Sequence, residues 1–181
     1  MRRCAFLIVL ALAGCAARPE PVPPVPPLAG HGSRAPGINA IEGAAEAFRH
    51  PERLQGRPAD AAVAVSRLEW AALAVPADET FDTFSTVTGP ALTAARWEVR
   101  RALGIATDAP GSVVMAGMEG AAAALARGDS AGAAAALPPP VFAPDTLARL
   151  ANLPRLPQAN LATLRAQRDI EFGRAEDWDF P

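Results

Sequence analysis

The 181-residue chain contains no lysine and no tyrosine, and only two cysteines and two histidines. Cys4 and Cys15 both lie near the N-terminus, so the rest of the chain offers no disulfide, no thiol nucleophile and no cysteine ligand for a metal. A Ser-His-Asp triad or a histidine metal site would have to use His31 or His50. We therefore predict that the chain is not an enzyme and needs no cofactor or metal.

Positive charge is carried by arginine alone. The 17 arginines stand against 19 acidic residues, for a net charge of −2. This balance excludes the basic surface that nucleic-acid binding requires. The length suits one domain with a proper core.

The first fifteen residues have the features of an export signal. Arg2 and Arg3 precede an apolar run of about ten residues, which is too short to span a membrane as a helix. The run ends in Leu12-Ala13-Gly14-Cys15, which resembles the lipobox of bacterial lipoproteins. An ordinary signal peptide with a chance cysteine is the alternative.

The lipobox resemblance implies a specific modification. Cys15 would be lipidated on its sulfur, the chain would be cut after Gly14, and the new amine would be acylated. By resemblance to Gram-negative sorting, Ala16 favours the outer membrane. Several acyl chains bind a bilayer stably, at about 0.8 kcal/mol for each buried methylene. The membrane is thus the first expected partner of the mature chain.

The composition divides the chain into four parts. Residues 1–14 form the signal peptide, residues 15–36 a lipidated proline-rich tether, residues 37–173 one helical domain, and residues 174–181 an acidic tail with two aromatics. A polyproline II tether rises about 3.1 Å per residue and would hold the domain up to about 60 Å from the membrane. A proline-rich ligand for a partner domain is the alternative for the tether. The tail either lies on the domain or acts as a docking peptide.

Apolar residues recur at helical spacing through the third part, and no segment shows clear strand alternation. We predict an all-α, irregular bundle of about six to seven helices. Prolines mark helix starts, and Gly104, Gly128 and Gly173 mark helix ends. The expected helices cover residues 38–49, 58–75, 88–103, 112–127, 130–137 and 157–172, with short helices near 78–84 and after 144.

Two helices carry patterns that bear on packing and binding. In helix 88–103, Arg96, Arg100 and Arg101 are expected on the exposed side, as a solvated face or as a reader of small anions. In helix 157–172, Leu161 and Leu164 are expected to face the core together with Ile170.

Helix ends also explain the tripeptide Arg127-Gly128-Asp129, which resembles an adhesion motif. A helix C-terminus favours glycine at the position of Gly128, and Asp129 suits the N-cap of the next helix.

The leading functional hypothesis is a non-enzymatic envelope scaffold or partner-binding module, with an envelope protein as its partner. The alternative is a helical domain that binds a lipid or small molecule in an apolar cavity. The residues that would line this cavity are Trp70, Phe81, Phe84, Met115 and Met118.

Overall fold

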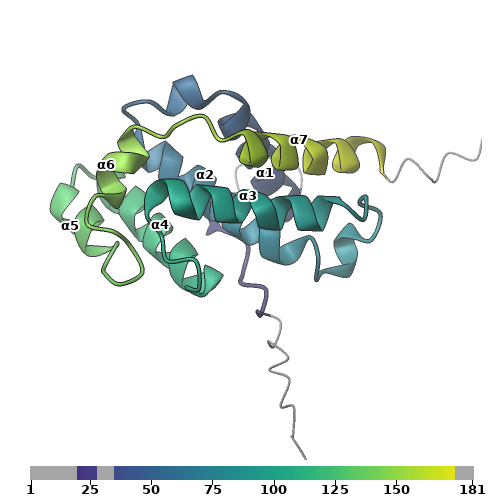
Figure 1. Cartoon of the computed structure of the whole chain (residues 1–181), viewed down its shortest axis with the longest axis horizontal. Coiled ribbons are helices and arrows are strands. Elements are labelled where there is room, and N and C mark those ends of the chain that lie inside the picture. The colour runs from purple at the N-terminus through teal and green to yellow at the C-terminus, as the bar shows by residue number, and fades with distance from the viewer. Residues whose placement is uncertain (1–19, 28–34, 174–181) are drawn as a thin grey trace, which may run out of the picture.

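A computed structural model describes residues 20–27 and 35–173 (Figure 1). Within these ranges the chain is all-α, with seven α-helices, the 3-10 helices η2 and η3, and no strand. This confirms the predicted fold class. The elements are α1 (Pro36–Arg49), η2 (Pro51–Leu54), α2 (Pro58–Ala74), η3 (Glu79–Phe81), α3 (Thr88–Leu103), α4 (Gly111–Ala126), α5 (Ser130–Ala135), α6 (Thr146–Ala151) and α7 (Pro157–Phe172).

The helix ends follow the proline and glycine positions. Pro58 and Pro157 begin α2 and α7, as predicted. Gly104 has φ 70° after α3, and the N–H of Ile105 donates back to the Arg100 carbonyl at 2.8 Å. Ile105 is buried beyond this turn. Local backbone preferences therefore determine where α3 stops.

α2 forms the centre of the domain. It packs against α1, α3, α4 and α6, while α7 covers α1 and α3 along one edge of the molecule (Figure 1). Most of the residues of α2 are buried, so its apolar surface runs almost all the way round. Its many alanines allow close approach from several directions, because an alanine side chain adds little bulk between two helices.

The packing of α7 corrects one expectation. Leu161 is 62% exposed and Leu164 is only partly buried, whereas Ile170 is partly buried and packs against the core as expected. Small and polar side chains face the core instead, because α7 lies between α1 and α3 and bulky residues would hold it away. The buried residues are Ala159, Ala162, Thr163, Ala166 and Asp169.

Residues 20–27 are packed against the domain, and we call them the strap. Pro26 is buried, Val25 packs against the core, and Glu20 is hydrogen-bonded to the domain. This corrects the expected free tether for these eight residues. Proline density predicts an extended backbone, but it does not reveal whether another part of the chain will bind that backbone.

Several expectations lie outside the described residues. They concern the lipobox with Cys15, the histidine at position 31, and the tail 174–181. Among the described residues, no helix combines the length and apolar character needed to cross a membrane.

Candidate functional site

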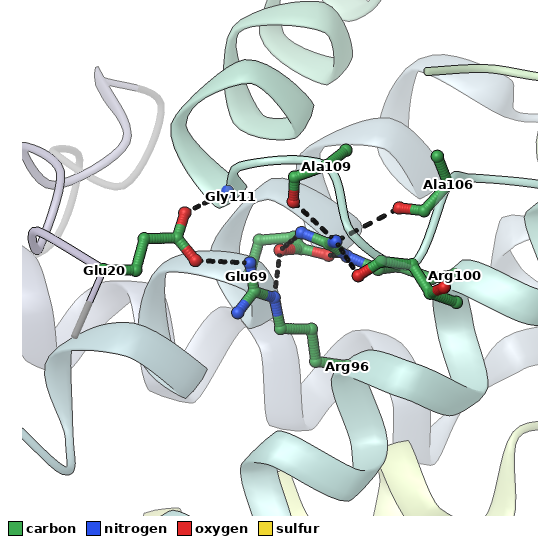
Figure 2. A network of polar contacts seen from close by, with 8 residues as sticks. Glu20, Glu69, Arg96, Arg100, Ala106, Ala109 and Gly111 are labelled. Atoms are coloured by element: carbon green, nitrogen blue, oxygen red, sulfur yellow. Dashed lines mark hydrogen bonds and ion pairs between the residues drawn. The ribbon is translucent and has the colours of Figure 1, made fainter. Parts of the chain in front are cut away.

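A buried ion-pair network joins α2, α3, the start of α4 and the strap (Figure 2). Its centre is the Glu69 carboxylate of α2. Oε1 of Glu69 accepts from Nε of Arg100 at 2.7 Å, and Oε2 accepts from Nη2 of Arg100 at 2.8 Å. Both side chains are only 1% exposed. This two-pronged geometry is the strongest form of an arginine–carboxylate contact.

Arg100 also holds the loop that follows α3. Its Nη1 donates to the carbonyls of Ala106, Thr107 and Ala109 at 3.2, 3.0 and 2.8 Å. The guanidinium thus provides donors for both Glu69 and the backbone that leads into α4. A buried arginine is tolerated here because its donors are satisfied.

Arg96, one turn before Arg100 on α3, extends the network to the strap. Its Nε donates to Oε2 of Glu69 at 2.7 Å, and its Nη2 donates to Oε2 of Glu20 at 3.0 Å. The second oxygen of Glu20 accepts the N–H of Gly111, the first residue of α4. Figure 2 shows Glu69 and Arg96 between Glu20 on one side and Arg100 on the other.

The charges of this network balance. Glu20 and Glu69 provide two negative charges, and Arg96 and Arg100 provide two positive charges. The Glu20 carboxylate also lies at the positive end of the α4 dipole, where no neighbouring side chain caps the helix. Removing the strap would leave an excess positive charge in a mostly buried site. The network is therefore suited to fixing the strap on the domain.

The network corrects the expected arginine face of α3. Arg101 is exposed as predicted, but Arg100 is buried and Arg96 is only 14% exposed. The sequence contained one usable signal. Glu69 stands between Leu68 and Trp70 in an otherwise apolar stretch of α2, where a carboxylate requires a cationic partner.

The five proposed cavity residues are all buried. Trp70 packs edge-on against Phe81, and Phe81 against Phe84, with ring centroids 6.1 and 5.1 Å apart. Met115 and Met118 lie on α4 at core positions. Phe81 and Phe84 border an open hollow of about 330 Å³ between the end of α2 and the start of α3. A ligand cavity shared by all five residues stays a prediction.

A second hollow of about 350 Å³ lies between α1, η2 and α2, and we call it the α1–α2 hollow. Its rim carries two ion pairs, Arg53 with Glu46 and Arg57 with Asp60. Arg67 lies deeper in this hollow, and burial lowers the pKa of its guanidinium from the ordinary value. His50 ends α1, as expected, and its Nδ1 lies 3.1 Å from Glu52 Oε1.

Residues 128–132 match the Gly-x-Ser-x-Gly pattern of hydrolase nucleophiles. That motif needs a turn from a strand into a helix. Here it links α4 to α5, Gly128 has φ 75°, and the Asp129 side chain accepts the N–H of Gly132 at 2.7 Å. The motif therefore acts as helix punctuation, as predicted for Gly128 and Asp129. Among the described residues, no group of three or more His, Cys, Asp or Glu side chains could hold a metal ion.

Neither a protein-family model, nor a curated protein, nor a solved structure matches this chain.

Proposed function

We propose that this chain is a bacterial lipoprotein, anchored in the outer membrane through acyl chains on Cys15 and facing the periplasm. Its helical domain would be a non-enzymatic scaffold or partner-binding module of the cell envelope. The observation that carries this proposal is the attachment of the strap. Glu20 follows Cys15 by five residues and is bonded to Arg96 and Gly111 of the domain. This contact would hold the domain beside its anchor.

The chemistry of the network supports a positional role. The carboxylate of Glu69 and the guanidinium of Arg100 are bonded to each other and are closed to solvent. A neutral, internally bonded cluster of this kind is suited to holding segments together.

The anchor can be tested with two cysteine variants. We expect Cys15→Ser to abolish the mature, detergent-dependent membrane form and to accumulate as precursor or as soluble periplasmic protein. Cys4→Ser is the matched control, because Cys4 lies within the apolar run and would leave with the signal peptide. Membrane fractionation and intact mass measure both outcomes. Wild-type mass and fractionation of Cys15→Ser would contradict the anchor.

The scaffold role can be tested by cross-linking in intact envelopes. We expect the wild-type chain to form a reproducible cross-linked species with an envelope protein, and Cys15→Ser to form less of it. The second protein is identified by mass spectrometry and then tested for binding to the purified lipoprotein. Recovery of no protein above the background of an untagged strain would count against the scaffold role.

A further inference from the structure

The strap limits how the domain can be placed at a membrane. This argument rests on the proposed acylation of Cys15. Glu20 is held by Arg96 and Gly111, and the other end of the strap is held by the burial of Pro26. The five residues from Cys15 to Glu20 span at most about 18 Å when fully extended. A domain of about 140 residues has a radius of gyration of about 14 Å, so this segment is too short to reach from the lipid to the far side of the domain. The surface around Glu20 must therefore lie near the lipid.

Three large, partly exposed apolar side chains belong to the segments that meet at Glu20, and we call them the strap-side patch. Val22 of the strap is 38% exposed, Trp97 of α3 is 41% exposed, and Val113 of α4 is 44% exposed. Trp97 lines a hollow of about 500 Å³ together with Glu20 and Arg96. Val113 lies in the first turn of α4, two residues after Gly111, whose N–H donates a hydrogen bond to the Glu20 carboxylate. All three side chains thus belong to segments that meet at Glu20.

The chemistry of the patch fits a lipid surface. Tryptophan prefers the boundary between water and acyl chains, because its ring is apolar and its N–H is polar. The hollow beside Trp97 contains Glu20 and Asp108 as well as Arg96, so it has no excess of positive charge to select anionic headgroups. Attraction to the bilayer would then come from the acyl anchor and from apolar contact.

We infer that the strap-side patch lies against the bilayer next to the acyl anchor, and that the Glu20 contacts hold the domain in this orientation. The strap would then orient the domain, presenting the surface that carries α7 away from the lipid. In Figure 1 the strap, in dark purple, leaves the helical body on the side away from α7.

The orientation can be measured with spin labels on the full acylated protein. Val113→Cys places a label in the patch, and Leu161→Cys places one on α7 at a side chain that is 62% exposed. The introduced cysteine would be the only reactive thiol, because the sulfur of Cys15 is acylated in the mature protein. Both proteins are reconstituted into vesicles of phosphatidylethanolamine and phosphatidylglycerol. Accessibility to oxygen and to a water-soluble nickel chelate then reports the depth of each label.

We expect the ratio of oxygen to nickel accessibility to be severalfold higher at position 113 than at position 161. Adding Glu20→Ala should reduce this difference while the protein stays on the vesicles. Equal ratios at the two positions in vesicle-bound protein would overturn the inference and leave the proposed anchor intact. Low accessibility to both reagents at position 113 would indicate a protein contact and would also overturn it. Failure of the wild-type chain to stay on vesicles would instead contradict the anchor itself.

Discussion

The two sides of α2 hold arginine–carboxylate pairs in opposite environments. Glu69 and Arg67 are two residues apart, so they point to roughly opposite sides of the helix, about 200° apart. On the Glu69 side, the network with Arg96 and Arg100 is almost closed to solvent. On the Arg67 side, the rim of the α1–α2 hollow has pairs whose side chains are 47% to 66% exposed. The same residue types therefore meet very different dielectric surroundings.

This difference shows which pairs matter to the fold. An exposed pair contributes about 0–1 kcal/mol, because water and salt compete with it. Breaking a buried pair costs about 3–5 kcal/mol, because a charge is left in the interior without its partner. The Glu69 side also joins segments far apart in the chain, since Glu20 and Gly111 are 91 positions apart. Four sets of variants test this contrast.

The largest effect is expected from Arg100→Met. This variant leaves Glu69 with one arginine and removes the donor from three loop carbonyls. We expect the free energy of unfolding to fall by about 3–5 kcal/mol, measured by urea denaturation followed by circular dichroism. Arg101→Met is the matched control, because its side chain is the exposed neighbour. Equal losses in the two variants would contradict the role of burial.

Asp169→Ala measures the cost of removing a buried carboxylate that is bonded to uncharged donors instead of to an arginine. Asp169 is buried on α7 and accepts from the Thr88 hydroxyl and from the Ser85 N–H, the latter at 3.2 Å. We expect a loss of about 1–3 kcal/mol, because these donors at the start of α3 lose their acceptor. Glu171→Ala, on the exposed side of the same helix, should change stability by about 0.5 kcal/mol or less. Urea denaturation measures the stability of both variants. If Asp169→Ala lost as much stability as Arg100→Met, the ion pairing of Arg100 would add little to the effect of burial.

Glu20→Ala tests the half-buried edge of the network, where the side chain is 28% exposed. We expect a loss of about 1 kcal/mol and faster hydrogen exchange at the Gly111 amide, because the strap loses its two polar contacts. Exchange is measured by mass spectrometry or by nuclear magnetic resonance. Glu79→Ala, at an exposed glutamate of η3, should leave hydrogen exchange at Gly111 unchanged. An unchanged Gly111 amide in Glu20→Ala would argue against the strap contact.

Arg53→Ala should have the smallest effect. Its pair with Glu46 is exposed at the rim of the α1–α2 hollow, so we expect a loss of about 0.5 kcal/mol or less at low salt. The loss should vanish in 1 M salt, where charges are screened within about 3 Å. Urea denaturation at the two salt concentrations measures it. A loss above 2 kcal/mol would remove the contrast between the two sides of α2.

Sequence reasoning succeeded where the answer depended on a few neighbouring residues. Pro157 and Gly173 bound α7 as predicted, and Gly104 ends α3 in the expected conformation. The same reasoning wrongly assigned Leu161 of α7 to the core, although Ile170 does pack against it. A helix between two neighbours buries small residues such as Ala162, and hydrophobicity alone favoured Leu161. Identifying the buried face required knowing how closely α1 and α3 approach.

The candidate site was predictable only in part. The sequence predicted Arg96, Arg100 and Arg101 on the exposed side of α3, and only Arg101 is exposed there. Arg96 and Arg100 do share one side of the helix, because they are one helical turn apart. The sequence could not show that this side meets Glu69, which lies 27 and 31 positions away, or that Glu20 completes the network from 76 positions away. Cys15, the residue with the most specific predicted chemistry, lies outside the described residues.

The amino-acid sequence by itself determined the all-α class and the helix boundaries, because proline and glycine act on their own backbone angles within one turn. Tertiary structure alone decided which charges are buried and where the strap lies. Those outcomes depend on desolvation and on partners brought together from distant parts of the chain, so no local pattern of residues contains them.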